Sequence, residues 1–348
     1  MIIVVKTEKE LQKCIEYCEK LEIISLDTET QGFDVFTKEL LTLQIGDRNI
    51  QFVIDCSKIN IISLKPILES KTCIAHNMKF DWQFLYHKGI DIKHIYDTFL
   101  VECILTTGYK REDKELGLTD LTNKYLGFYL DKSTRGKINY LGIDNEEVIA
   151  YAARDIEFLE QIRELQLIEI SKWKLDRILQ LENEVVRCFA LMEYNGISFN
   201  KGKLKEVTTE LHTINKDLIF KLDNIIVEEA THNKNLIRYT QVQQDLFTED
   251  VRKTLINWAS PFQKGEILNK LGIHVTDVSD KTLQKLKKSH PIIPLFIELS
   301  KFNKLESSFG SGLLKFINPV TNRIHSSIWQ ILQTGRISMS EPKQNWAA

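Results

Sequence analysis

The stretch Ile23-Ile24-Ser25-Leu26-Asp27-Thr28-Glu29 decides the fold of the first half, because an apolar run passes directly into a D-x-E pattern. Residues 23–27 predict a β-strand, and the two-residue period of a strand places Ser25 and Asp27 on one face and Leu26 on the other. Alone the pattern is weak. With 19 Asp and 29 Glu in the chain, about one or two matches arise by chance, and a solvent-exposed turn after a strand explains it equally well.

Around this strand, residues 1 to about 172 predict an α/β domain. Short β-rich runs occur at 2–5, 23–27, 40–45 and 50–55, and helical patterns at 61–69, 78–87, 98–106 and from 146 into 165–170. Clustered strands followed by helices favour a mixed sheet with helices packed on it. From 173 to 348 helical periodicity dominates, at 175–195, 204–230 and 294–302 running toward 314. We therefore expect a second, mainly α-helical domain.

Composition excludes several classes of protein. A chain of 348 residues that is 43% hydrophobic, with 15 Gly and 6 Pro, is neither collagen-like nor disordered and is long enough for two domains. No apolar run reaches about eighteen residues, and the N-terminus lacks the features of a secretory signal. The six cysteines form no C-x-x-C pair, which indicates reduced thiols rather than zinc ligands or disulfides. These features predict a cytoplasmic protein.

The net charge of -2 hides an asymmetry. From residue 200 onward there are 21 Lys+Arg and 15 Asp+Glu, a net charge of +6. The preceding residues contain the remaining 25 Lys+Arg and 33 Asp+Glu, a net charge of -8. A basic half suits a surface that contacts phosphates, and an acidic half suits a metal-binding surface. The alternative is that two ordinary domains differ by chance.

A second acidic motif is Asn77-Met78-Lys79-Phe80-Asp81. The pattern N-x-x-[FY]-D is scarce, with about 0.1 matches expected by chance. Because Asn77 and Asp81 are four residues apart, they share one face of the predicted helix. The alternative is that the Asn77 side chain caps the helix start and Asp81 is a solvated surface residue.

A third motif, Tyr151-Ala152-Ala153-Arg154-Asp155, repeats this spacing. Asp155 falls within the apolar stripe of its helix, whose other members are Val148, Ala152, Leu159 and Ile162. An unpaired buried carboxylate is costly, so we expect a metal ion or a basic side chain beside it.

Together the motifs supply four carboxylates: Asp27, Glu29, Asp81 and Asp155. An all-oxygen set without histidine suits two Mg²⁺ or Mn²⁺ ions rather than zinc. Two ions about 4 Å apart can bind the attacking and leaving oxygens of a phosphoryl displacement, and Tyr151 would orient the attacking water. The set therefore predicts hydrolysis of a phosphodiester.

These residues resemble the DEDD superfamily of 3′-5′ exonucleases, in the subgroup whose third motif is Y-x-x-x-D. The matching stretches are SLDTET, AHNMKFD and YAARD, in family order over about 160 residues. The resemblance implies a ribonuclease H-like exonuclease domain over 1–172. It also implies that Asp27 bridges both ions, that Glu29 and Asp155 bind the ion that activates water, and that Asp81 binds the other. Asp97 and Asp120 lie in lesser matching stretches and are expected to be structural.

The second half resembles family A DNA polymerases of the polymerase I type. The matching stretches are 181–199, 260–271 and above all 312–345, which includes QTGRIS at 333–338. The resemblance implies a partial polymerase domain over 173–348, with the thumb at about 200–310 and the start of the palm at 311–348. Arg336 would contact the primer-template duplex, with a surface arginine as the alternative. The palm and fingers motifs of the family are absent, so a truncated or split polymerase is expected, with a separate chain as a candidate partner.

The leading prediction is a metal-dependent 3′-5′ exonuclease that trims single-stranded or frayed 3′ DNA ends. Phe33 is a candidate for stacking on the terminal base, although a buried Phe is the commoner outcome. Asn77 is a candidate nucleic-acid contact, although a role in positioning the helix suits it better. Two alternatives stay open: a non-catalytic DNA-binding subunit of a two-chain polymerase, and RNA 3′ trimming like that of RNase D-like enzymes.

Overall fold

A computed structural model describes residues 1–109, 115–131, 142, 144–243 and 251–341. The chain divides into two compact units: Met1–Ile197 together with Asn318–Ala348, and Ser198–Ile317. Residues 342–348 of the expected palm start lie outside the described residues. These units are defined by contacts within the folded chain and include a C-terminal segment in the first unit. They do not test the domain division expected at residue 172, which stays a prediction.

The first unit is built on a six-stranded mixed sheet with the order β1-β4-β3-β2-β5-β6. The strands are β1 (Ile2–Val5), β2 (Ile23–Thr30), β3 (Leu40–Gly46), β4 (Gln51–Asp55), β5 (Thr72–Ala75) and β6 (His94–Asp97). Strand β3 runs antiparallel to β2 and to β4, while the other neighbouring strands are parallel. The register places Asp27 opposite Gln44 and Glu29 opposite Thr42. The predicted mixed sheet is confirmed.

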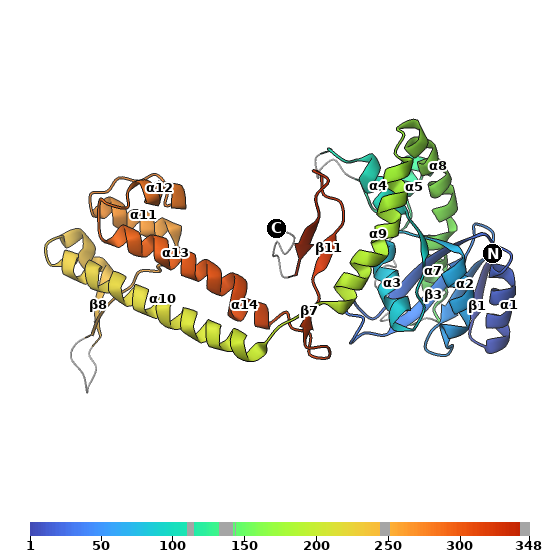
Figure 1. The fold of residues 1–348 in the computed structure, drawn as a ribbon, viewed down its shortest axis with the longest axis horizontal. Coiled ribbons are helices and arrows are strands. Elements are labelled where there is room, and N and C mark those ends of the chain that lie inside the picture. Colours follow the sequence, from blue (N-terminus) through green and yellow to red (C-terminus); the bar gives the residue numbers. More distant parts are fainter. Residues whose placement is uncertain (110–114, 132–141, 143, 244–250, 342–348) are drawn as a thin grey trace. The chain divides into compact units, whose positions relative to one another are not determined.

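Helices surround this sheet (Figure 1). They are α1 (Glu8–Cys18), α2 (Lys65–Ser70), α3 (Met78–His87), α4 (Thr98–Leu105), α5 (Leu118–Leu126), α7 (Glu146–Glu157), α8 (Leu159–Lys172) and α9 (Asp176–Asn195), with a 3-10 turn η1 (Ile61–Leu64). The apolar stripe predicted around Asp155 is confirmed, because Val148, Ala152, Leu159 and Ile162 are buried.

One predicted helix is divided in two. The continuous helix expected from 146 into 165–170 breaks at Phe158, where α7 ends and α8 begins. The ring of Phe158 packs edge-on against Phe128, with centroids 5.0 Å apart. This contact joins residues 30 positions apart, so the local helical pattern contains no sign of it.

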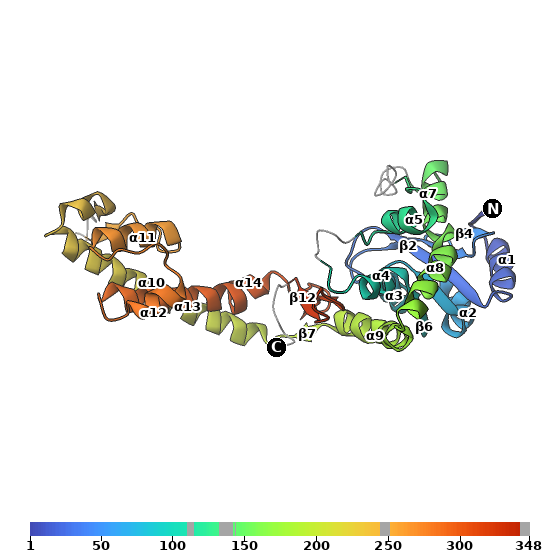
Figure 2. The same ribbon diagram turned by 90° about the horizontal axis from the view of Figure 1, so that it is seen from above.

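The C-terminal part of the first unit adds short strands: β10 (Arg323–Ile324), which pairs with β7 (Ile197–Ser198), and β11 (Ser327–Trp329), which pairs with β12 (Ser338–Ser340). The second unit is mainly helical, as predicted. Its long helices α10 (Lys201–Ala230) and α13 (Ile292–Phe309) lie side by side (Figure 2). The smaller elements are η3 (Lys234–Tyr239), β8 (Thr240–Gln243), β9 (Val251–Thr254), α11 (Pro261–Lys270), α12 (Asp280–Lys285) and α14 (Ser311–Leu314).

Candidate metal centre

Three of the predicted carboxylates converge. Asp27, Glu29 and Asp155 each offer one oxygen, and these three oxygens lie within 4.8 Å of one another. All three side chains are half-buried. The first and third motifs, whose carboxylates Glu29 and Asp155 are 126 positions apart in the sequence, thus contribute to one acidic cluster.

Local structure explains how the cluster forms. Asp27 and Glu29 are two residues apart on β2, so strand geometry places them on one face of the sheet. Helix α7 packs across β2, β3 and β4 and contributes Asp155. The Asn145 side chain caps this helix by accepting hydrogen bonds from the backbone N–H groups of Glu147 and Val148. Burial of the Val148 and Ala152 side chains holds α7 against the sheet.

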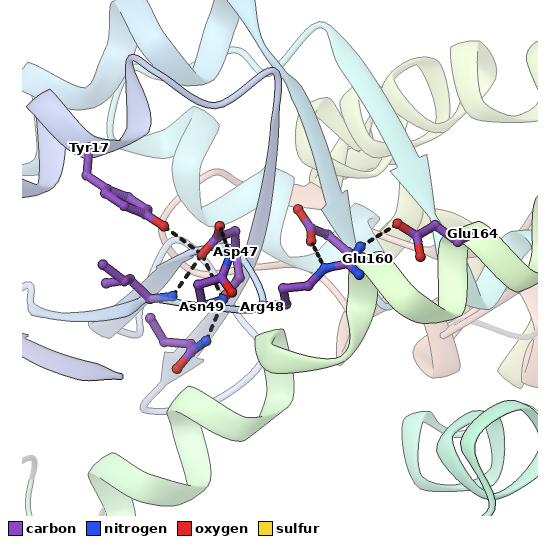
Figure 3. A network of polar contacts seen from close by, with 8 residues as sticks. Tyr17, Asp47, Arg48, Asn49, Glu160 and Glu164 are labelled. Atoms are coloured by element: carbon purple, nitrogen blue, oxygen red, sulfur yellow. Dashed lines mark hydrogen bonds and ion pairs between the residues drawn. The ribbon is translucent and has the colours of Figure 1, made fainter.

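A polar network holds the next helix to the same sheet (Figure 3). Arg48, in the turn between β3 and β4, donates from Nε to Glu160 of α8 at 2.6 Å and from Nη2 to Glu164. Asp47 stiffens this turn by accepting from the backbone N–H groups of Asn49 and Ile50 and from the Tyr17 hydroxyl. Because α8 follows α7 directly, these bonds also restrain the end of the helix that carries Asp155.

Asp81 lies beside the cluster but is held separately. Its Oδ1 accepts a 2.5 Å hydrogen bond from the hydroxyl of Thr28, the residue between Asp27 and Glu29. The side chain is only 2% exposed, and its charge is close enough to contribute to the pKa shift of Asp27. The sequence alternative of a solvated Asp81 is therefore wrong.

The start of α3 differs from the expected cap. Asn77 occupies the N-cap position, with a left-handed backbone (φ 70°, ψ 49°), but its side chain makes no capping hydrogen bond. Asp97 caps the helix instead, because its two carboxylate oxygens accept from the backbone N–H groups of Asn77 and Met78. The same carboxylate accepts from Phe99 and Leu100 at the start of α4. The suggestion of an Asn77 side-chain cap is wrong, whereas the structural role expected of Asp97 is confirmed.

The electrostatics of the cluster favour a cation. Burial, and then the negative charges of Asp81, Asp155 and Glu29, raise the pKa of Asp27 well above its ordinary value. Burial raises the pKa of Asp81 to about 7, against the opposing effect of the Thr28 hydrogen bond. Carboxylates crowded in this way retain protons more readily unless a positive charge is bound between them.

The neighbouring atoms also fit a hard divalent ion. The candidate ligand atoms of Asp27, Glu29 and Asp155 are all carboxylate oxygens, which Mg²⁺ and Mn²⁺ prefer. Within the described ranges, two buried oxygens near Asp27 have no hydrogen-bond partner: Oγ of Ser25 and Oε1 of Gln44. Gln44 lies directly across the strand pair from Asp27, and Ser25 precedes Asp27 by two residues on the same strand. A hydrated ion supplies the donors that such oxygens need.

The remaining candidates lie as follows. Tyr151 precedes Asp155 by four residues on α7 and so shares its face of the helix. Phe33 is 92% exposed, in contrast to the commoner buried Phe, and its ring meets Phe80 edge-on with centroids 6.0 Å apart. Asn77 and Arg336 are exposed. Thr28 is a further site residue that was not predicted, because its only sequence signal is its place inside the D-x-E pattern.

Two family models match the chain. Residues 2–166 match the model described as 3'-5' exonuclease, and residues 206–345 match the model described as DNA polymerase family A. The fold and the acidic cluster thus belong to an exonuclease domain of the DEDD type, followed by polymerase sequence. Residues 206–345 are thus similar to family A DNA polymerases, and residues 2–166 are similar to their 3'-5' exonuclease domain, as the motifs indicated.

Curated relatives are similar to nearly the whole length of the chain. The chain is 27% identical over 355 residues to the DNA polymerase I of Borreliella burgdorferi, covering 97% of this chain and 36% of that protein. It is 24% identical to the DNA polymerase I of Aquifex aeolicus, covering 96% and 56%. The chain therefore spans between about a third and about half of these relatives.

A solved structure shares the fold. The POL domain of Pol1 from M. smegmatis, in complex with DNA primer-template and dNTP, matches with a TM-score of 0.73 and 18% sequence identity. The match covers 98% of this chain and 55% of that one.

Among the described residues, no helix is long and apolar enough to cross a membrane.

Proposed function

We propose that the chain is a metal-dependent 3′-5′ exonuclease that removes nucleotides from the 3′ end of DNA, the proofreading part of a family A polymerase. The observation that carries the proposal is the convergence of Asp27, Glu29 and Asp155 within 4.8 Å on a domain that matches the 3'-5' exonuclease model. Asp81, tied to Thr28 beside them, completes the set of four carboxylates.

The proposed cofactor is a pair of Mg²⁺ or Mn²⁺ ions. Asp27 would hold both, Glu29 and Asp155 one, and Asp81 the other. Bound divalent ions supply positive charge to the scissile phosphate and lower the pKa of water. The carboxylates supply the negative charge that holds the ions and, by their fixed positions, set where the phosphate lies.

Other side chains are proposed to handle the substrate. The Tyr151 hydroxyl, one helical turn before Asp155, would hydrogen-bond the attacking water and orient it. Phe33 is 92% exposed, and an exposed aromatic ring is a stacking surface for an unpaired base. Asn77, exposed at the start of α3, would contact the nucleotide backbone. Arg336, exposed in the turn before β12, would contact the phosphates of the duplex.

A direct test uses 5′-labelled single strands of DNA and RNA of identical sequence, together with matched and mismatched DNA duplexes, with Mg²⁺ or with EDTA. The proposal predicts stepwise 3′ shortening of the DNA that requires Mg²⁺ and is faster on single-stranded or mismatched ends than on matched duplex. Faster shortening of the RNA would favour RNA 3′ trimming. Retention of duplex DNA without any shortening would favour a DNA-binding subunit.

A further inference from the structure

Glu193, on α9, joins three elements through one buried carboxylate. The residue is 9% exposed. Its Oε1 accepts hydrogen bonds from the Lys79 ammonium group and from the backbone N–H of Ile328. Its Oε2 accepts from the Gln83 amide at 2.6 Å. Lys79 also donates to the carbonyl oxygen of Ile328, so Lys79, Glu193 and Ile328 form a closed ring of hydrogen bonds.

This ring bears on the helix that carries Asp81. Lys79 and Gln83 are four residues apart on α3 and share one side of it. Asp81 lies midway between them, about 200° around the helix axis from each. Glu193 therefore holds one side of α3, and Thr28 holds the carboxylate that projects from the opposite side.

The third partner comes from a distant part of the sequence. Ile328 lies on β11, inside the stretch that matches DNA polymerase family A, whereas α3 lies inside the exonuclease match. Further contacts hold this segment to α9 and α4 of the same unit. Gln330 donates to the carbonyl oxygen of Glu182 at 2.8 Å, and the ring of Trp329 meets that of Phe99, with centroids 6.1 Å apart.

We infer that Glu193 is a positioning residue for Asp81, and that through it the β11 segment of the polymerase match supports the metal centre of the nuclease. The inference rests on the proposed function, since it assigns Asp81 to the metal centre. Its physical basis is that a carboxylate this deeply buried needs all its donors, so each of the three elements is fixed by the other two.

The test is a donor–acceptor swap. In Glu193→Gln, an NH₂ group replaces the oxygen that accepts from Gln83, so Gln83 keeps this contact only by turning its amide away from the carbonyl oxygen of Ala190, and Lys79 loses its counter-charge. The double variant Glu193→Gln/Gln83→Glu restores both a negative charge and an acceptor. Glu184→Gln, at an exposed position of the same helix, is the matched control. The readouts are Mn²⁺ affinity by calorimetry, kcat and KM on single-stranded DNA, and the melting temperature of each variant without metal.

We expect Glu193→Gln to weaken Mn²⁺ binding and to lower kcat by about 10-fold each, the lower end of the range for residues that act through a metal ligand. KM should change less than about two-fold, and the double variant should recover most of both losses. Wild-type Mn²⁺ affinity and kcat in Glu193→Gln would overturn the inference. A double variant that melts at the wild-type temperature but recovers neither Mn²⁺ affinity nor kcat would also overturn it.

The two proposals fail in distinguishable ways. If the wild-type chain binds Mn²⁺ but releases no nucleotides, the proposed function fails, while a weakened Mn²⁺ affinity in Glu193→Gln still supports the positioning role. If Glu193→Gln does not fold, the double variant decides: recovery of both folding and Mn²⁺ affinity supports the ring, and folding without Mn²⁺ affinity contradicts it.

Discussion

The Thr28 hydroxyl donates a 2.5 Å hydrogen bond to Oδ1 of Asp81, across 53 positions of sequence. Thr28 lies between two carboxylates on β2, so this one strand serves two helices: Asp27 and Glu29 meet Asp155 of α7, and Thr28 holds Asp81 of α3. Burial raises the pKa of Asp81 to about 7, and the Thr28 bond limits that rise. The ionisation of Asp81 thus depends on the residue in the middle of the D-x-E pattern.

Thr28→Val should therefore impair metal binding near neutral pH. Without the donor, the pKa of Asp81 rises further, by about one unit for a hydrogen bond to a charged group worth about 1.5 kcal/mol. The lower limb of the pH–rate profile should shift to higher pH by about that amount. The measurement is kcat against pH from 6 to 9, with Thr28→Ser, which keeps the hydroxyl, as the control. An unchanged profile in Thr28→Val would show that the bond does not govern Asp81.

The stability of the metal-free protein should fall as the pH rises. The folded-state pKa values of Asp27 and Asp81 lie above the ordinary aspartate value, so the folded chain binds more protons than the unfolded chain between pH 4 and pH 7. Their contribution to stability is present at low pH and is lost as the pH rises through the folded-state values.

Added Mg²⁺ should reverse this loss, and should raise the melting temperature more at pH 8 than at pH 5.5. The measurement is urea unfolding and melting at both pH values, with and without Mg²⁺. Asp27→Asn removes one of the carboxylates whose pKa is raised and should flatten the pH dependence. The same Mg²⁺ effect at both pH values would contradict the account.

Much of the first unit is visible in the sequence. The four strands from β1 to β4 were predicted within a few residues of their ends, because alternation and β-branched runs are local signals. Strands β5 and β6 were not predicted, since four residues are too few to show a period and both strands are mostly buried. Helix α1 was also missed, although its Thr7 and Glu10 form a capping box.

The site, like the fold, combines features that local sequence patterns predict with features that they do not. The three acidic motifs are local patterns, and the structure brings three of their carboxylates together. The supports of these carboxylates are not local: Asp97 caps a helix that begins 19 residues earlier in the chain, and Glu193 meets Lys79 across 114 positions. A sequence pattern gives the period of one element. It does not state which residues of two distant elements will meet.

Asp97→Ala should destabilise the fold more than an ordinary cap variant. Asp97 caps both α3 and α4, so its loss should lower the free energy of unfolding by about 2–4 kcal/mol, twice the usual cost of one cap. Asp120→Ala, which removes one bond to the Gly117 N–H at the start of α5, should cost about 1 kcal/mol. Urea denaturation compares the two. Equal losses would contradict the double role of Asp97.

Phe33→Ala should weaken substrate binding without affecting folding. A side chain 92% exposed contributes little to the core, whereas loss of one stacked base costs about 1–3 kcal/mol. KM for single-stranded DNA should rise about 5-fold or more, with an unchanged melting temperature. Trp173→Ala, at an exposed aromatic 64% accessible beyond α8, is the control. An unchanged KM in Phe33→Ala would remove it from the substrate site.

The central claim is that the carboxylate cluster performs metal-dependent hydrolysis at DNA 3′ ends. The most direct measurement is the single-turnover rate of nucleotide release from a 5′-labelled DNA strand by the wild-type chain, Asp155→Asn and the exposed control Asp176→Asn, each with Mg²⁺ and with EDTA. The account predicts Mg²⁺-dependent release by the wild type and Asp176→Asn, and a rate at least about 100-fold lower in Asp155→Asn. Release by Asp155→Asn at the wild-type rate, or release in EDTA, would contradict it.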